Sequence, residues 1–207
     1  MIVPEWVGET VFIVACGPSL RGFNARQLQG RRVIAINDSF ELVPFADVLY
    51  FCDLRWWQTR KIKVRDVFHG RRLVTLENKI DGVVTMKSTG LTGLETDPIG
   101  LRNGGNSGYQ SINLAYHFGA SRICLLGFDM KVDGEWMHWN QRPERQQPVS
   151  FQRTLSTQML PHFSSLKKPL LDAGVEVINC TPNSALRVWP FVPLHKVLNS
   201  QGTAAVQ

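Results

Sequence analysis

Short apolar runs, separated by polar stretches, mark the positions of the strands expected in this chain. The runs are continuous rather than alternating, which is typical of strands covered by other elements on both faces. Six of them are rich in Val, Ile, Leu and Phe, over residues 11–15, 32–36, 47–51, 71–76, 121–128 and 175–180. We therefore expect a sheet whose strands are buried on both sides.

Between these runs, apolar side chains recur at the spacing of a helix. Residues 106–120 carry them near one face, with Asn106 or Ser107 as N-cap and Gly119 as the C-terminal stop. A helical stretch is also expected over residues 19–29, directly after the first strand. Strands that alternate with helices predict a mostly parallel sheet with right-handed crossovers.

A third helical region covers residues 150–173. Pro161 and Pro169 are expected to divide or kink it, because proline removes a helical hydrogen bond. Two stretches are expected to be flexible loops. The first is 88–105, which contains five glycines, and the second is 130–150, which has the length of a lid or binding loop.

The length of 207 residues fits one α/β domain, and two full domains are not expected. We predict a single Rossmann-like domain over residues 1–207 that ends in a frayed tail over 200–207. No apolar run reaches the roughly 20 residues that span a bilayer, and the N-terminus lacks a basic region followed by an apolar core. A cytoplasmic location follows as an expectation.

The four cysteines stand singly and far apart, at positions 16, 52, 124 and 180. Without a CxxC motif or a Cys/His pairing, a zinc site is not expected, and buried reduced thiols are the simpler interpretation. Lys and Arg number 23 against 17 Asp and Glu, which gives a net charge of +6. This excess favours anionic partners, namely nucleotides, phosphates, anionic glycans or nucleic acid.

Polar residues gather directly after five of the apolar runs. Because ligands bind beyond the carboxyl ends of the strands in such sheets, these residues form the candidate site. In chain order they are Gly17, Pro18 and Ser19; Asn37 and Asp38; Asp53; Gly127 and Asp129; and Thr181, Pro182, Asn183 and Ser184.

The first of these clusters has two interpretations. Gly17 lets the backbone turn sharply, and Pro18 suits the first turn of a helix, so a tight turn alone would explain the sequence. Alternatively, the unpaired N–H groups of this turn and the helix dipole hold a phosphate. Neither GxGxxG nor GxxxxGK[ST] occurs in the chain, so the tight turn is favoured when this stretch is taken alone.

Asn37 and Asp53 also have two interpretations each. The Asn37 amide can pair with a base edge or a ribose hydroxyl, or it can cap the next helix. Asp53 can bind a metal or a sugar hydroxyl, or it can cap the helix that starts near Leu54. Capping is favoured at each position taken alone.

His138 stands on the polar loop that follows Asp129. Its pKa, near ~6.5 when unperturbed, suits a general base at neutral pH, and an exposed histidine without function is the alternative. Residues 55–66 hold five basic residues and two tryptophans. They form either a nucleic-acid patch or, as we favour, a solvated helix face with buried aromatics.

The order of these motifs resembles a known group of enzymes. "GPSL", a strand that ends in asparagine, "NSGYQSINLAYHFGASRICLLGFDM", a loop histidine and "CTPNSAL" follow one another as in the bacterial sialyltransferases of glycosyltransferase family 42. The chain is also similar to the MptE-like group, which includes 6-hydroxymethylpterin diphosphokinases and flagellin-modification proteins, and to short proteins carried by bacteriophages. The resemblance covers residues 11–186.

The resemblance implies a nucleotide site and a catalytic base. In these sialyltransferases the glycine-proline-serine turn, the asparagine and the serine-glycine helix start hold the cytidine nucleotide of the donor, and a loop histidine takes the proton from the acceptor hydroxyl. The catalytic candidates here are His138 and Asp129. The nucleotide-binding candidates are Gly17, Pro18, Ser19, Asn37, Asp53, Asn106, Ser107, Gly108, Gly127, Pro182, Asn183 and Ser184.

The chain departs from the family pattern at two places. Cys16 stands where the family often has asparagine before "GPSL". The family steadies the leaving phosphate with tyrosine hydroxyls, and no tyrosine follows Asp129 in the loop. Arg142 and Arg145 are the candidates to supply that stabilisation here.

Three hypotheses of function follow. The leading one is a nucleotide-dependent transferase, a glycosyltransferase that uses a CMP-type sugar donor as substrate and an unidentified acceptor, with no further cofactor assigned. The second is an MptE-like diphosphotransferase that uses ATP and Mg²⁺, with Asp53 or Asp129 helping to hold the metal. The third is a non-catalytic phage protein that binds a nucleotide or, less favoured, nucleic acid.

Overall fold

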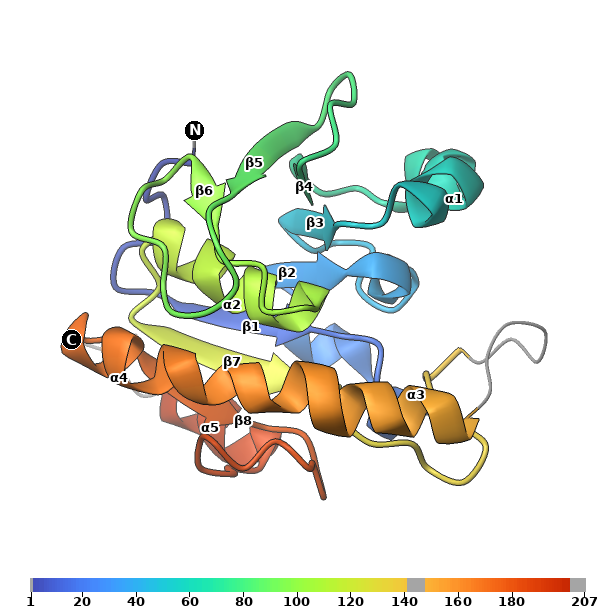
Figure 1. Ribbon diagram of the computed structural model, residues 1–207, viewed down its shortest axis with the longest axis vertical. Coiled ribbons are helices and arrows are strands. Elements are labelled where there is room, and N and C mark those ends of the chain that lie inside the picture. The colour runs from blue at the N-terminus through green and yellow to red at the C-terminus, as the bar shows by residue number, and fades with distance from the viewer. Residues whose placement is uncertain (1, 141–147, 202–207) are drawn as a thin grey trace.

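The computed structural model describes residues 2–140 and 148–201 (Figure 1). Within these residues, eight strands pair in parallel to form one sheet in the order β6-β5-β4-β3-β2-β1-β7-β8. Helices cover both faces of this sheet. The chain therefore forms a single Rossmann-like α/β domain, as the alternation of apolar and helical stretches predicts.

All six strands expected from the apolar runs are confirmed, and two further strands extend the sheet. The strands are β1 (Thr10–Val14), β2 (Arg32–Ile36), β3 (Val48–Phe51), β4 (Arg72–Leu76), β5 (Val84–Ser88), β6 (Gly100–Leu101), β7 (Arg122–Leu126) and β8 (Glu176–Asn179). Since β5 and β6 lie at one edge and β5 is largely exposed, they lack the continuous apolar run that marks the other six. The loop expected over 88–105 is therefore interrupted by β6.

The two faces of the sheet carry separate cores, because successive side chains of each strand point to opposite sides. In β1, Val11 and Ile13 pack into one core, while Phe12 and Val14 pack into the other. The first core is covered by α2 (Ser107–His117) and α4 (Ser164–Asp172), and the second by α1 (Leu54–Val67) and α5 (Leu194–Gln201). Strands that are covered on both faces need apolar residues at every position, which explains their continuous runs.

The helix expected directly after β1 does not form. Residues 19–29 instead contain parts of two 3-10 segments, Pro18–Leu20 and Ala25–Leu28, and Gly22 between them has a φ of 72°. Such a φ lies outside the helical region, so the chain turns twice here rather than continuing one helix.

The helical region after the second expected loop is one long irregular segment, seen in orange in Figure 1. It comprises α3 (Pro148–Thr154), a π-helical turn (Leu155–Met159), a 3-10 turn (Leu160–Phe163) and α4. Pro161 lies in the 3-10 turn, which confirms the expected division there, whereas Pro169 lies inside α4 without ending it.

The basic stretch 55–66 lies on α1 and forms the solvated helix face that we favoured. Its aromatic side chains pack inward, with Trp57 stacked on Phe51 at 4.9 Å between ring centroids. Two of its cations pair with acidic side chains of the preceding segment, Arg60 with Asp38 and Lys63 with Glu41.

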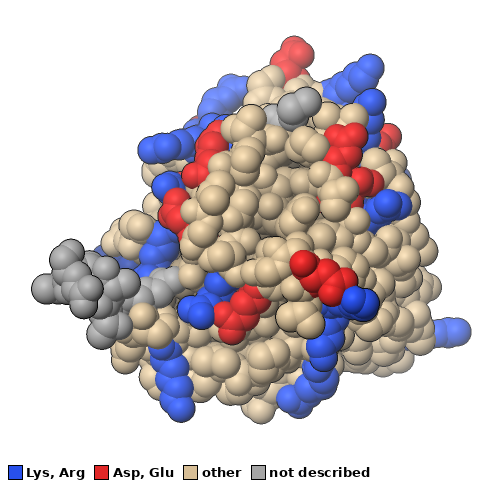
Figure 2. Space-filling model, turned by 90° about the vertical axis from the view of Figure 1, so that its left-hand side faces the viewer, with Lys and Arg blue, Asp and Glu red and all other residues tan. Residues whose placement is uncertain are grey.

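The net positive charge is not gathered into one patch on the side of the molecule where β1 and β7 begin. Figure 2 shows this side, and Lys and Arg side chains there are interspersed with Asp and Glu side chains. Ion pairs such as Arg72–Glu5 and Arg122–Glu176 account for part of this pattern. No helix in the described part of the chain has both the length and the apolar character needed to cross a membrane.

A buried hydrogen bond joins the sheet to α2 and yields a first prediction. The Tyr50 hydroxyl donates to Gln110 Oε1 at 2.8 Å, and both residues are buried. Tyr50→Phe leaves this amide oxygen without its donor, so we expect the free energy of unfolding in urea to fall by about 1–3 kcal/mol.

The half-buried Tyr116 provides the matched control. Its hydroxyl has no hydrogen bond within residues 2–140 and 148–201, so Tyr116→Phe should change the free energy of unfolding by less than about 0.5 kcal/mol. Equal effects of the two substitutions would contradict a specific contribution from the Tyr50–Gln110 bond.

Candidate functional site

A cavity of about 300 Å³ opens at the carboxyl ends of β1, β2, β3 and β7. The strand order reverses here, because β2 lies on one side of β1 and β7 lies on the other. Such a switch point is where open α/β sheets bind their ligands. Nine of the residues expected from the sequence line this cavity, namely Gly17, Pro18, Asn37, Asn106, Ser107, Gly108, Gly127, Asp129 and His138.

The remaining expected residues lie elsewhere. Ser19 does not line the cavity, but it hydrogen-bonds to Asp129, which does. Asp53 caps α1 by accepting a hydrogen bond from Arg55 N at 2.7 Å, which is the capping interpretation of this residue. Arg142 and Arg145 lie outside the described residues.

The Pro182-Asn183-Ser184 element lines a separate cavity of about 280 Å³ beyond β8. It is nevertheless in contact with the wall of the first cavity, because Ser184 Oγ donates to the carbonyl of Phe128 at 2.5 Å. Thr181 Oγ1 in turn accepts from Phe128 N at 2.9 Å. This element therefore supports the candidate site from outside.

The turn at Gly17 does not offer its N–H groups to a phosphate, contrary to the phosphate interpretation. Gly17 N donates to the carbonyl of Gly127 at 3.0 Å, and Leu20 N donates to the carbonyl of Gly17 at 3.2 Å. Ser19 N donates to Asp129 Oδ1 at 3.0 Å, and Ser19 Oγ donates to Oδ2 at 2.8 Å. A carboxylate of the protein itself thus occupies the place expected for the phosphate.

Gly17 is required at this turn because a larger residue would displace Asp129. A Cβ atom at position 17 would lie 1.9 Å from Asp129 Oδ2 and 2.4 Å from the carbonyl oxygen of Gly127. The "GPS" sequence therefore encodes the close approach of the end of β1 to the end of β7. This is a structural role, and Asp129 acts in it as a positioning group.

The N-terminus of α2 supplies the donors that the Gly17 turn lacks. Asn106 caps the helix, accepting from Tyr109 N at 2.9 Å, as its position before the helix predicts. Ser107 and Gly108 are the first two helical residues and line the cavity. Backbone N–H groups at these positions have no partner within a helix, and the helix dipole makes this end attractive to anions.

Asn37 places a buried polar atom at the cavity. Its side chain lines the wall, and its Oδ1 is buried without a hydrogen-bond partner among the described residues. Its φ of 49° is in the left-handed region, which is uncommon for a residue other than glycine. An unpaired buried oxygen and a strained backbone both cost free energy, and such costs are typical of binding sites.

His138 lines the cavity on the segment that follows Asp129. Its ring lies beside the backbone of Cys16 and packs edge-on against Phe151, with 5.3 Å between the ring centroids. Burial lowers the pKa of His138, and the charge of Asp38 and the bond to Cys16 only partly oppose this shift. The ring is therefore neutral at neutral pH, as a general base must be.

Sequence reasoning missed several residues of the cavity wall. Lys131 lines it and brings a positive charge close to Asp129. Part of the apolar wall comes from the α3 segment and the π-helical turn that follows it, through Phe151, Leu155 and Met159. Their helical spacing identified a helix but gave no indication that it faces the site, although π-helical turns are frequent at functional sites.

A cluster that could hold a metal ion is not present among the described residues. No group of three or more His, Cys, Asp or Glu side chains comes together there. Asp53 and Asp129, the expected ligands under the magnesium hypothesis, accept hydrogen bonds from the backbone N–H groups of Arg55 and Ser19, respectively.

Comparisons of this chain with protein-family models, with curated proteins and with solved structures found no match.

The buried carboxyl of Asp129 yields a pH-dependent prediction. Burial raises its pKa above the ordinary 3.8, although the hydrogen bonds from Ser19 oppose this. The folded state therefore binds this proton more tightly than the unfolded state. The resulting stabilisation is complete below pH 3.8 and is lost as the pH rises through the higher folded-state pKa.

Asp129→Asn removes this proton without removing either contact to Ser19. The amide oxygen can accept from Ser19 N, and the amide nitrogen can donate to Ser19 Oγ. We expect the stability of the wild type relative to Asp129→Asn, measured by urea unfolding, to decrease from acidic to neutral pH. Asp53→Asn, at the exposed cap of α1, controls for the loss of a carboxylate elsewhere in the chain. If the free energy of unfolding of the wild type and of Asp129→Asn changed with pH in parallel, the prediction would be contradicted.

Proposed function

We propose that this protein is a nucleotide-dependent transferase, and that its donor is a CMP-type sugar nucleotide bound in the cavity between β1 and β7. The observation that carries the proposal is the convergence of three groups on this cavity. They are the N-terminus of α2, the unpartnered amide oxygen of Asn37 and the neutral ring of His138. In the proposed complex, the helix N-terminus binds a phosphate, the Asn37 oxygen binds the nucleoside and the His138 ring accepts a proton.

The lining of the cavity suits a nucleoside. Thioether and aromatic side chains form much of the wall, as is usual for ligand pockets, and a few polar groups stand among them. In the proposed complex, Asn37 Oδ1 accepts a hydrogen bond from an amino group of the base or from a ribose hydroxyl. That bond satisfies an oxygen that has no partner among the described residues.

The phosphate is proposed to bind at the N-terminus of α2. The N–H groups of Ser107 and Gly108 lie at the positive end of the helix dipole, and Lys131 adds a full positive charge. The Gly17 turn is not part of this phosphate site, since the Asp129 carboxylate already occupies it.

In the proposed reaction, the acceptor hydroxyl loses its proton to His138 and its oxygen forms a bond to the sugar carbon of the donor. The bond between that carbon and the phosphate oxygen breaks, and the electron pair leaves with the nucleotide. The neutral imidazole of His138 keeps one ring nitrogen as an acceptor for this proton. The developing charge on the phosphate is stabilised at the helix N-terminus.

A charge placed at the start of α2 tests the phosphate site. Ser107→Asp puts a carboxylate beside the proposed phosphate, and an acidic residue in the first turn does not destabilise a helix. In a thermal-shift panel of cytidine, CMP, UDP, ATP and a CMP-sugar, we expect weaker binding of the phosphorylated ligands and unchanged binding of cytidine. For the wild type, ligand at 100 times its Kd should stabilise the fold by about 2.7 kcal/mol.

Ser164→Asp is the matched control, because Ser164 is the exposed first residue of α4 and lies away from the cavity. It should leave binding of every ligand unchanged. Equal loss of CMP binding in both variants, or no nucleotide binding by the wild type, would contradict the proposed site.

The role of His138 is tested by separating binding from turnover. His138→Gln keeps a group that can hydrogen-bond to the Cys16 backbone but cannot take a proton. We expect CMP affinity to stay within about twofold, and hydrolysis of a CMP-sugar, with water as the acceptor, to slow by about 10²–10⁴-fold. A variant that binds CMP and retains full turnover would exclude His138 as the base.

The same base should be visible in the pH dependence of the wild type. Because burial lowers the pKa of His138 below its ordinary 6.5, the neutral ring is still the major form at that pH. The midpoint of the acid-side decline in the rate of CMP-sugar hydrolysis should therefore lie below pH 6.5.

A further inference from the structure

The cavity of about 280 Å³ beyond β8, called here the β8 cavity, is lined by residues between positions 179 and 191. It lies at the same edge of the sheet as the proposed transferase site, but the two cavities share no lining residue. Its described lining includes apolar, amide, hydroxyl and guanidinium side chains and no carboxylate. A ligand that fits the β8 cavity must therefore offer both apolar and polar surface.

Hydrogen bonds fix the polar side chains at the back of this cavity. Asn179 Nδ2 donates to the carbonyl of Leu186 at 3.0 Å, and Thr181 N donates to Asn179 Oδ1 at 3.0 Å. Ser184 Oγ accepts from Leu186 N at 3.0 Å, besides its bond to the Phe128 carbonyl. These side chains give the cavity a defined shape, and the contacts to a ligand are left to its exposed residues.

Arg187 supplies the charge of the β8 cavity. It is exposed, and its guanidinium makes no hydrogen bond or ion pair with residues 2–140 and 148–201. No other residue of the described lining is charged. The planar guanidinium is therefore available to give two parallel hydrogen bonds to a carboxylate.

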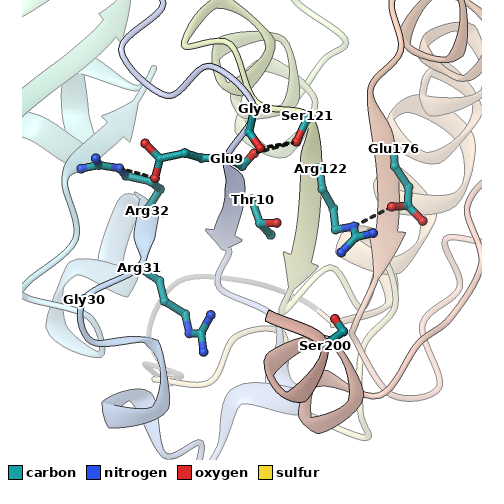
Figure 3. A pocket seen from close by; sticks show the side chains of 10 residues that line it. All are labelled: Gly8, Glu9, Thr10, Gly30, Arg31, Arg32, Ser121, Arg122, Glu176 and Ser200. Carbon is teal, nitrogen blue, oxygen red and sulfur yellow. Dashed lines mark hydrogen bonds and ion pairs between the residues drawn. The ribbon is translucent and has the colours of Figure 1, made fainter. Parts of the chain in front are cut away.

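The arginines of the cavity at the opposite edge of the sheet show the contrast. That cavity, of about 690 Å³, opens where β1, β2, β7 and β8 begin (Figure 3). Arg32 is paired there with Glu9 at 2.9 Å, and Arg122 is paired with Glu176 at 2.5 Å. These ion pairs already satisfy part of the arginine donors, whereas Arg187 has no such counterpart among the described residues.

The β8 cavity also has donors and acceptors without partners. The exposed Asn183 amide carries both kinds of group, and it makes no hydrogen bond in the described part of the chain. Phe191 forms an isolated parallel bridge with Asn179, in which the bonds run to the two neighbours of Phe191. Its own N–H and C=O therefore point away from β8 and have no described partner. Hydroxyl groups of a ligand could pair with both kinds of group.

Two aromatic residues provide the apolar surface. Trp189 is buried and packs edge-on against Phe163, with 6.1 Å between the ring centroids, so its position is fixed by the core. Phe191 is 49% exposed although it is a large apolar residue. Its ring therefore offers a surface on which a ligand can remove apolar area from water.

We propose that the β8 cavity binds an acidic monosaccharide, a hydroxylated ring that carries one carboxylate. In this complex Arg187 binds the carboxylate, Asn183 binds ring hydroxyls, and the apolar C–H face of the ring packs on Phe191. A plain aromatic acid lacks the hydroxyls that would satisfy these amide and backbone groups.

Charge and size support this class of ligand. One unpaired guanidinium matches the single charge of a carboxylate better than a phosphate ester, which carries about −1.5 to −2 at pH 7. The volume of about 280 Å³ lies just below the roughly 300–1,000 Å³ of pockets for drug-sized ligands, which favours one ring over an oligosaccharide.

This inference does not rest on the proposed transferase activity. Because the two cavities share no residue, Arg187→Gln should leave CMP binding unchanged. A wild-type protein that binds no nucleotide would contradict the proposed function but not the β8 site.

The test is calorimetric titration of the full chain with glucuronate, glucose, acetate and glucose 6-phosphate at constant ionic strength. Glucuronate should bind the wild type at least about tenfold more tightly than the other three ligands. Arg187→Gln should raise the Kd of glucuronate by about tenfold or more, because it removes a charge-assisted contact. Phe191→Ala should also raise this Kd.

Arg65→Gln is the matched control, because it removes an exposed positive charge from α1, which covers the other face of the sheet from Trp189. It should leave the Kd of glucuronate within about twofold. Arg187 and Phe191 are both exposed, so their variants should keep the melting temperature of the wild type within a few degrees.

Four results would overturn the proposal. They are no detectable binding of glucuronate by the wild type, equal losses in Arg187→Gln and Arg65→Gln, binding of acetate as tight as that of glucuronate, and tighter binding of glucose 6-phosphate. The second would indicate general charge attraction, the third a simple anion site, and the fourth a phosphate site.

Discussion

The hydrogen bonds between Asp129 and Ser19 are the contacts on which the rest of the carboxyl edge depends. They join the ends of β1 and β7, which are neighbours in the sheet but more than a hundred residues apart in sequence. The contact requires glycine at position 17, because any Cβ there would collide with the carboxylate. It also keeps a desolvated acidic group at the switch point, where burial raises the pKa of Asp129. Gly17 and Asp129 both line the carboxyl-edge cavity, so this contact fixes part of its wall.

The other proposed contacts of the site therefore come from other elements of the fold. Because the Asp129 carboxylate fills the Gly17 turn, the proposed phosphate is assigned to the start of α2. The segment that follows Asp129 returns to the end of β1, where Trp139 N donates to the carbonyl of Cys16 at 3.0 Å and so fixes the position of His138. Asn140 holds the segment from its other side by donating to Asp38, which also binds Arg60 of α1. His138 is thus positioned by the segments that follow β1 and β2.

The two edges of the sheet offer complementary chemistry. At the carboxyl edge the wall is largely apolar and a few polar groups converge, which suits a nucleoside. At the amino edge, guanidinium groups and hydroxyls surround a larger space with no apolar side chain in its described lining. The proposed nucleotide is anionic, in agreement with the net charge of +6, but a net charge does not identify the edge at which a ligand binds.

The sequence by itself determined the six strands β1 to β4, β7 and β8, α2 with its Asn106 cap, and the edge at which polar residues gather. Continuous apolar runs and capping residues are local signals. Only the tertiary structure decided that Asp129 fills the Gly17 turn, that the π-helical turn walls the cavity, and that β5 and β6 extend the sheet. These features depend on contacts between distant segments, and β5 is stabilised by pairing with β4 rather than by its own apolar pattern. Gly17 shows the limit most clearly. The sequence around Gly17 allows either a tight turn or a phosphate loop. A carboxylate from the end of another strand occupies the turn, and the tight turn is what forms.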